Sequence, residues 1–173
     1  MYEESRRGEP GVMAHAYDPV AQPKLFESVL ARRVIAFFID VLVIAVPLAL
    51  LAIFILMFGL VTLGLGWFLF LLFTPITVIW ALFYYGLTLG SPACASIGMR
   101  MVGIEMRTWY GGEMYFLLGA VHAVGFWLTV SLLTPFVLLV GLFNDRKRLL
   151  HDMLLGTIVI NSAARTDAPP QWR

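Results

Sequence analysis

"ARRVIAFFID" (residues 31–40) opens the hydrophobic region that decides the fold of this chain. Two arginines stand near its start, and Asp40 lies inside an otherwise apolar run. After Asp40 the sequence has no Asp, Glu, Lys or Arg until Arg100. A bilayer core about 30 Å thick needs roughly 20 apolar residues of helix to cross it. The stretch from Val41 to Phe83 exceeds that length, so it predicts membrane-spanning helices.

The composition of the whole chain indicates the same class of protein. Hydrophobic residues make up 60% of the 173 residues and charged residues 13%, against roughly 45–50% and about 25% in ordinary globular proteins. A second stretch without charged side chains runs from Met114 to Asn144. We therefore expect an all-α integral membrane protein whose first partner is the lipid bilayer. The net charge of +1, with no large basic block, predicts no nucleic-acid partner.

Three long apolar helical regions are expected inside a membrane domain of residues 31–162, with spans at about 34–58, 67–87 and 114–143. A polar tail (residues 1–30), expected to be disordered, precedes this domain, and a flexible tail (residues 163–173) follows it.

The third apolar region allows two interpretations. One helix over residues 114–143 would be about 45 Å long, which is enough for one tilted span and too short for two full ones. "SLLTPF" (131–136) offers a break, because the residue before a proline resists the helical conformation. We favour a kinked or re-entrant helical hairpin, and a single tilted span is the alternative.

Two short strands are predicted between and after the spans, at about 102–107 and 156–160. They can pair if they lie on the same side of the membrane. Basic residues flank each apolar region, and the positive-inside tendency places them, with the N-terminus, in the cytoplasm. This predicts a two-stranded pairing at the cytoplasmic face of a multi-pass membrane protein.

Three motifs in this order resemble the RDD family of small bacterial membrane proteins, named for one arginine and two aspartates. They are "RRVIAFFID" (32–40), "SIGMRMVGIEM" (96–106) and "HDMLLGTIVI" (151–160). The resemblance covers about residues 31–161, and it implies a location in the bacterial inner membrane. It implies that the arginine is Arg33 or its neighbour Arg32, and that the two aspartates are Asp40 and Asp152.

The middle motif departs from the family pattern of a threonine, a glycine and then a basic residue. Here those positions read Ser96, Gly98 and Met99, and the basic charge comes one place later, at Arg100. The family has been suggested to transport ions or other solutes, and cation/proton exchange has been proposed for some members. The other motif positions singled out are Gly103, His151, Gly156 and Thr157.

Asp40 is expected to have a partner, because a charged Asp at a helix centre costs on the order of 2.5–3.5 kcal/mol and somewhat less at this depth. Arg33 lies about 10.5 Å away along the helix axis, so we expect it to extend towards the lipid headgroups instead. The candidate partners are then Arg100, Arg107, His122 and the cluster 146–148. Asp40 is either half of a structural ion pair or a titrating site in an ion path.

His122 is the ionisable residue of the third apolar region. It is either a neutral histidine hydrogen-bonded to a neighbouring helix or a proton-relay partner of Asp40. His151 and Asp152 are adjacent, and adjacent side chains on a helix diverge, so they do not predict a hydrolytic dyad. We expect Asp152 to clamp the C-terminal segment to Arg100 or to a helix N-terminus.

The functional expectation follows from these groups and from the motifs that are missing. The sequence has no glycine-rich phosphate loop, H-E-x-x-H or G-x-S-x-G. We therefore expect no enzyme and no cofactor, and the single Cys94 excludes a cysteine-rich metal site. One hypothesis is a transporter of a small monovalent cation or proton-coupled solute, acting as a homo-oligomer. The alternative is a membrane scaffold or accessory subunit whose buried charges fix helix packing.

Overall fold

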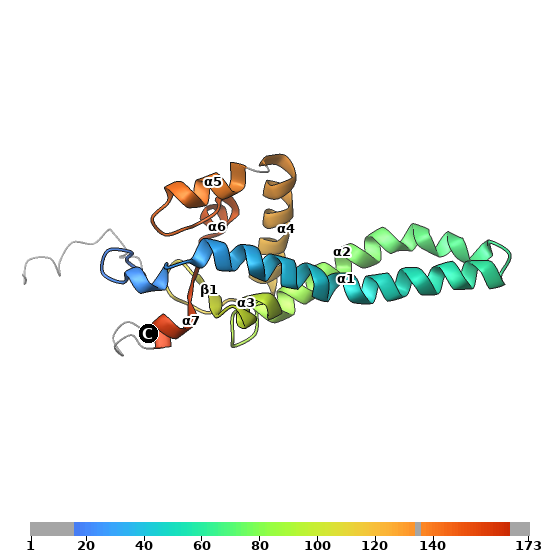
Figure 1. Cartoon of the computed structure of the whole chain (residues 1–173), viewed down its shortest axis with the longest axis horizontal. Helices are drawn as coiled ribbons and strands as arrows, with labels where there is room; N and C mark the ends of the chain where they lie inside the picture. The colour runs from blue at the N-terminus through green and yellow to red at the C-terminus, as the bar shows by residue number, and fades with distance from the viewer. Residues whose placement is uncertain (1–15, 134–135, 167–173) are drawn as a thin grey trace, which may run out of the picture.

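The computed structural model describes residues 16–133 and 136–166, and most of them are helical. Two long helices come first, and shorter helices and two strands follow (Figure 1). In chain order the elements are η2 (Pro23–Leu25), α1 (Val29–Val61), η3 (Leu65–Leu69), α2 (Phe70–Leu89), α3 (Ile97–Met101), β1 (Ile104–Thr108), α4 (Phe116–Leu133), α5 (Phe136–Phe143), α6 (Leu150–Leu155), β2 (Thr157–Asn161) and α7 (Ser162–Thr166).

Helices α1 and α2 form an antiparallel hairpin that extends away from the other elements (Figure 1). Thr62 shapes its turn, because its hydroxyl donates to Phe58 O (2.7 Å) and accepts from Gly66 N (2.7 Å). Gly59 has no room for a side chain, since a Cβ there would lie 1.8 Å from the Trp67 ring. The glycine-rich connection between the first two apolar regions is therefore a tight turn.

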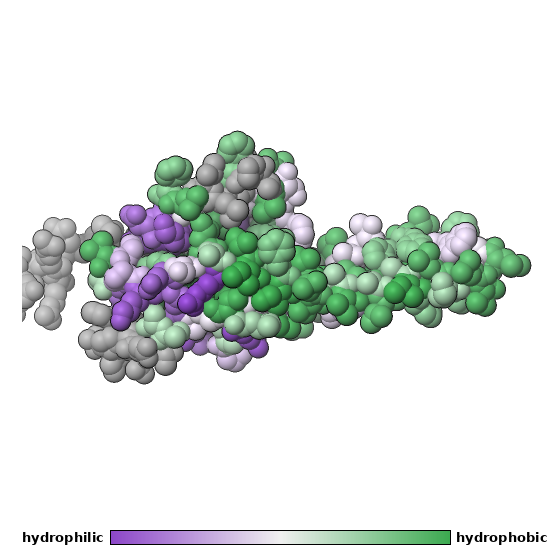
Figure 2. Space-filling model, in the orientation of Figure 1, coloured by the Kyte–Doolittle hydropathy of each residue, from purple (hydrophilic) through white to green (hydrophobic). Residues whose placement is uncertain are grey.

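The far half of the hairpin presents apolar side chains on its surface, as Figure 2 shows. Leu63 is 96% exposed and Leu71 is 76% exposed. The segments Pro23–Val61 and Leu65–Leu89 are each long and apolar enough to cross a bilayer, whereas α4 falls short of that length. An apolar surface of this extent is typical of a membrane or interaction site, so the hairpin indicates a membrane protein.

The third apolar region is two helices, α4 and α5, rather than one continuous helix. The expected break, at Thr134 and Pro135, lies outside the described residues. Helix α5 has 8 residues, about 12 Å of helix, which is too short for a second crossing. Helix α4 packs against the C-terminal part of α2, where a Cβ on Gly119 would lie 2.9 Å from Tyr85 O. Small residues of this kind let two backbones approach closely.

Strands β1 and β2 pair antiparallel, with Ile104 opposite Asn161 and Thr108 opposite Thr157. The predicted pairing is therefore confirmed, with its boundaries shifted by one or two residues. One group of sheet residues packs with the ends of the long helices, in a core that includes Val29, Leu89, Ile104, Met106 and Val159.

The N-terminal segment packs against the sheet, so the expectation of a disordered tail up to residue 30 is wrong for residues 16–28. Tyr17, Leu25 and Phe26 are buried in a second core with Ile158 and Ile160. Asn161 fixes the segment, because its Nδ2 donates to Lys24 O (2.8 Å) and Glu27 O (2.9 Å). At the other end of the chain, the expected flexible tail (residues 163–173) overlaps helix α7, so its residues 163–166 are helical.

Candidate functional site

Asp40 lies in the middle of a network of uncharged donors. Its side chain is buried, at 3% exposed. Oδ1 accepts from the Tyr84 hydroxyl (2.5 Å) and from Gly98 N (2.8 Å), and Oδ2 accepts from the Ser96 hydroxyl (2.5 Å). None of the ion pairs within the described residues includes Asp40. The prediction that Asp40 forms an ion pair with a cationic side chain is therefore wrong, and its partners are two hydroxyls and a backbone N–H.

The middle motif folds around this carboxylate. Ser96 is the N-cap of α3 and accepts from Met99 N (3.2 Å) while its own hydroxyl proton goes to Asp40. Gly98 lets α3 touch α1, because a Cβ there would lie only 2.2 Å from Ala36 O. Buried polar groups in folded proteins are normally hydrogen-bonded, and here hydroxyl and amide donors provide those bonds to the carboxylate.

The basic residues proposed as partners of Asp40 are engaged elsewhere. Arg100 is exposed, and its Nε donates to Ala95 O (3.0 Å). Arg107 pairs with Glu105 (3.4 Å), which also pairs with Arg165. Arg32 Nη1 donates to Val102 O (3.2 Å), next to Gly103, and to the side chain of Asn161 (3.1 Å). These contacts connect segments at the ends of helices and strands, and they are separate from the hydrogen bonds of the Asp40 carboxylate.

Arg33 and Asp152 form a buried ion pair, with 2.5 Å between Nη1 and Oδ2. Arg33 therefore does not extend to the headgroups, and Asp152 does not reach Arg100, because the two side chains pair with each other instead. Leu149 N also donates to Oδ2 (2.9 Å), across the N-terminus of α6 as expected. Burial alone would raise the pKa of Asp152, but Arg33, the two nearby histidines and this N–H lower it to about 2.

His122 and His151 converge on the other oxygen of Asp152. Their Nε2 atoms lie 3.6 Å and 3.7 Å from Oδ1, beyond hydrogen-bonding distance, and the two rings meet edge to face. Burial lowers the pKa of His151, although the Asp152 charge opposes this. These side chains are buried, and their ligand atoms lie within 4.8 Å of one another. This group could therefore hold a metal ion.

Neighbouring residues hold the side chains of His122, His151 and Asp152 in position. Thr129 Oγ1 lies 3.0 Å from Nδ1 of His151, and Thr157 Oγ1 lies 3.4 Å from Nδ1 of His122. Arg148 donates to the backbone oxygens of Asp152 (2.8 Å) and Thr157 (2.9 Å). Gly156, with φ +63°, turns the chain from α6 into β2.

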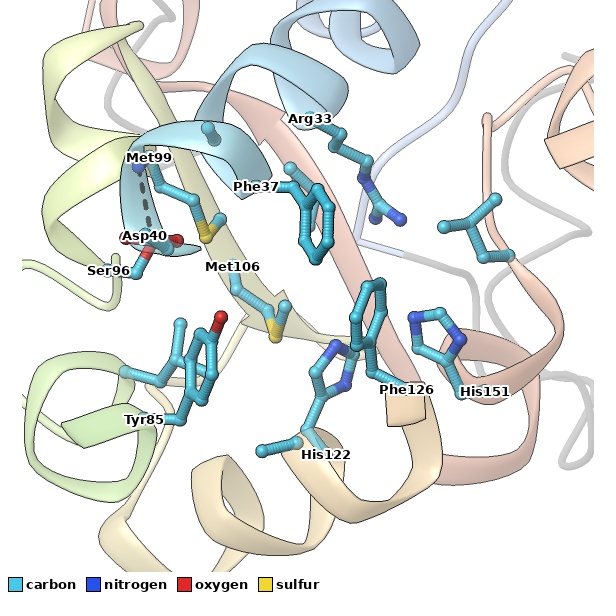
Figure 3. A pocket seen from close by; sticks show the side chains of 15 residues that line it. Arg33, Phe37, Asp40, Tyr85, Ser96, Met99, Met106, His122, Phe126 and His151 are labelled. Carbon is cyan, nitrogen blue, oxygen red and sulfur yellow. Dashed lines mark hydrogen bonds between the residues drawn. The ribbon is translucent and has the colours of Figure 1, made fainter. Parts of the chain in front are cut away.

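A cavity of about 90 Å³ lies between the two carboxylate networks. Figure 3 shows Asp40 and Ser96 on one side of it and Arg33, His122 and His151 on the other. At about 30 Å³ each, up to three waters would fit. Nε and Nη2 of Arg33 are buried and have no hydrogen-bond acceptor among the described residues.

Sequence reasoning identified Asp40 and His122 as functional candidates but did not place His151, Thr129 or Tyr84 beside them. His122 lines the same cavity as Asp40, yet the carboxylate it approaches is that of Asp152. The sequence did carry a signal that could have paired the two histidines, because His122 and His151 are two of only 3 histidines in the chain.

Comparison with protein-family models matches residues 28–156 to the RDD family, which is more than half of the chain. The match spans both aspartates, the arginine pair and both cavity histidines. Comparisons with curated proteins and with solved structures gave no significant match.

Proposed function

Since this chain belongs to the RDD family, whose members are membrane proteins, we propose that it transports a small monovalent cation or a proton-coupled solute across the bacterial inner membrane. One observation carries the proposal. A cavity in the apolar domain has a carboxylate on one side and an arginine with two histidines on the other. Ionisable groups within apolar membrane helices are rare and by default indicate ion or proton paths.

The bonding of Asp40 leaves it able to bind a cation. An ionised carboxylate offers about four acceptor positions, and Asp40 uses three of them on Tyr84, Ser96 and Gly98. The remaining position belongs to Oδ2, on a side chain that lines the cavity. A proton or a small ion such as Na⁺ would bind there, and apolar neighbours such as Phe37 and Met106 would keep bulk water away.

We also propose that the transporter is a homo-oligomer and that its N-terminus lies in the cytoplasm. Two long helices extend far beyond the cavity, and two helices do not enclose a polar path across a bilayer. Further copies of the chain would supply the missing walls along the apolar hairpin. Flanking basic residues such as Arg100 and Lys147 would remain at the cytoplasmic surface.

A second candidate function is a non-transporting scaffold or accessory subunit. The observation that favours it is that each carboxylate fastens separate segments together. Asp40 joins α1 to α2 and α3 through Tyr84 and Ser96, and Asp152 joins α6 to α1 through Arg33. In this function the buried charges would serve architecture alone.

Ion-driven proton movement in proteoliposomes distinguishes the two functions. Vesicles that contain a pH dye receive Na⁺, Li⁺ or K⁺ gradients, with the parent protein, Asp40→Asn and Arg100→Gln compared at equal protein content. Transport predicts a cation-dependent pH change that Asp40→Asn loses and Arg100→Gln, which alters an exposed residue outside the cavity, retains. A silent but well-reconstituted parent protein would instead support the scaffold function.

A further inference from the structure

We propose that His122, His151 and Asp152 form a binding site for a divalent transition-metal ion of the zinc class. The ligand atoms would be Nε2 of each histidine and Oδ1 of the aspartate. This inference goes beyond the proposed transport function, because it concerns an ion bound at the far side of the cavity from Asp40. It holds whether or not an ion is moved across the membrane.

The distances come close to those of a metal centre before any ion is bound. Zn²⁺ binds histidine nitrogen and aspartate oxygen at about 2.0–2.2 Å, which puts neighbouring tetrahedral ligands about 3.4 Å apart. The two nitrogen-to-oxygen distances here are 3.6 Å and 3.7 Å, and the ligand atoms all lie within 4.8 Å of one another. Movements of the side chains of less than about 1 Å would complete the geometry.

The hydrogen bonds around His151 are compatible with a bound cation. The Thr129 hydroxyl has one proton, and it donates to the helix carbonyls of Gly125 (2.8 Å) and Phe126 (3.0 Å). Its oxygen lies 3.0 Å from Nδ1 of His151, where it can accept from Nδ1–H. In that tautomer the neutral ring has an unprotonated acceptor at Nε2, which faces a carboxylate oxygen of Asp152 at 3.7 Å. A positive ion between these two acceptors would satisfy both.

The other ligands are oriented in the same manner. Thr157 Oγ1 lies 3.4 Å from Nδ1 of His122 and 3.5 Å from Oδ1 of Asp152, so it supports both ligands. The second oxygen of Asp152 is held by Arg33 and by Leu149 N, which leaves Oδ1 directed at the histidines. Metal-binding histidines usually have such an outer partner on the second ring nitrogen.

The ligand set indicates the class of ion and the character of the site. Two imidazoles with one carboxylate favour Zn²⁺, Co²⁺ or Ni²⁺, whereas Mg²⁺ and Ca²⁺ prefer oxygen ligands. Three protein ligands beside a cavity leave a fourth position open, unlike the closed sites that only stabilise a fold. The Arg33 guanidinium, paired to the same carboxylate, repels the ion, so binding should be reversible.

The test is metal binding by the full chain, purified in detergent with an affinity tag that contains no histidine. Titration with Zn²⁺ is followed by calorimetry, and Co²⁺ is followed by visible absorption, which reports low-coordination nitrogen and oxygen ligands. His15→Gln is the matched control, because it removes the remaining histidine of the chain. We expect one ion per chain in the parent protein and in this control.

Two kinds of variant connect the signal to the proposed ligands. His122→Gln and His151→Gln should each weaken binding by about 100-fold or more, and Thr129→Val, which only removes the outer hydroxyl, by about 10–100-fold. Since Thr129→Val keeps all three ligands and nearly the same volume, it tests the site even if a ligand variant fails to fold.

Three results would overturn the site. They are no binding by folded parent protein at millimolar Zn²⁺, binding lost in His15→Gln, or unchanged binding in the folded ligand variants or, if neither folds, in Thr129→Val. A failed flux assay alone would count against transport and leave this inference standing, because the binding titration needs no vesicle.

Discussion

Arg33 and Asp152, which are 119 residues apart in the sequence, form a buried ion pair at the point where the first long helix meets α6. The Asp152 side chain is fully buried and that of Arg33 is 11% exposed. Removing one partner of such a pair leaves a charge without compensation in a low-dielectric site. The pair therefore attaches α6, in the C-terminal part of the domain, to α1.

Arg33→Gln should lower the free energy of unfolding by about 3–5 kcal/mol, because it leaves the buried Asp152 carboxyl group without its cation. Denaturation in detergent micelles would measure the loss. Arg32→Gln is the matched control, since among residues 16–133 and 136–166 that neighbour donates to Val102 O and Asn161 and forms no ion pair, and its loss should be about 1.5 kcal/mol. The double variant Arg33→Gln/Asp152→Asn should recover part of the stability. Equal losses in the two single variants would contradict a special role for the pair.

Gly98→Ala should separate α3 from α1 and loosen the donors around Asp40. The added Cβ would lie 2.2 Å from Ala36 O, a backbone atom that cannot move without its helix. We expect a loss of several kcal/mol, at the upper end of overpacking effects of about 1–3 kcal/mol. In Gly125→Ala the nearest contact is an ordinary 3.4 Å, so the added helix propensity should keep or improve stability. A wild-type melting temperature for Gly98→Ala would refute the close contact.

Ala123→Val tests whether the cavity is used. Ala123 is buried and lines the cavity, so the larger side chain fills part of about 90 Å³ without removing a charged group. A scaffold should keep or gain up to about 1 kcal/mol from the added burial. A transporter should keep its fold and lose most of its flux, which the vesicle assay would show. Undiminished flux in a folded variant would exclude this cavity from the path.

Tyr17 should make the protein sensitive to alkali. Burial raises the pKa of its hydroxyl, although Arg107 and Arg165 oppose this, whereas a tyrosine of the unfolded chain ionises near pH 10. Above that pH the unfolded state loses a proton that the folded state keeps, so stability falls as pH rises towards the folded pKa. Melting curves between pH 8 and about 11 should therefore fall less steeply for Tyr17→Phe than for the parent. Parallel pH profiles would show that this tyrosine does not contribute.

The long apolar runs allowed the two helices of the hairpin to be predicted, and β-branched residues allowed the strand pairing to be predicted. Local composition is enough to predict each helix and each strand, because each forms from neighbours in the sequence, and the pairing of the two strands followed from placing both on the same side of the membrane. The partners of Asp40 could not be found in this way. Tyr84 and Ser96 carry no charge, so nothing in the sequence distinguishes their hydroxyls from many others.

The cluster around Asp152 was missed for a different physical reason. Its members lie on α1, α4 and α6, and they meet because α6 packs against α4 while Asp152 on α6 reaches Arg33 on α1. Spacing along one helix correctly predicted that Arg33 is too far from Asp40 to pair with it. It could not predict that Arg33 would pair with Asp152, 119 residues later, instead of reaching the lipid headgroups. The N-terminal segment was misjudged because Tyr17, Leu25 and Phe26 are too few to form a periodic pattern.

The contacts of Asn161 impose an order on biosynthesis. Its side chain holds the backbone of Lys24, which is 137 residues earlier in the chain. At roughly 5–20 residues per second, the ribosome would need about 7–27 s to make that length. Throughout this interval the N-terminal segment has neither its hydrogen-bond donor nor the strand that buries Tyr17. The first part of the described chain to be synthesised is therefore among the last to be fixed in place.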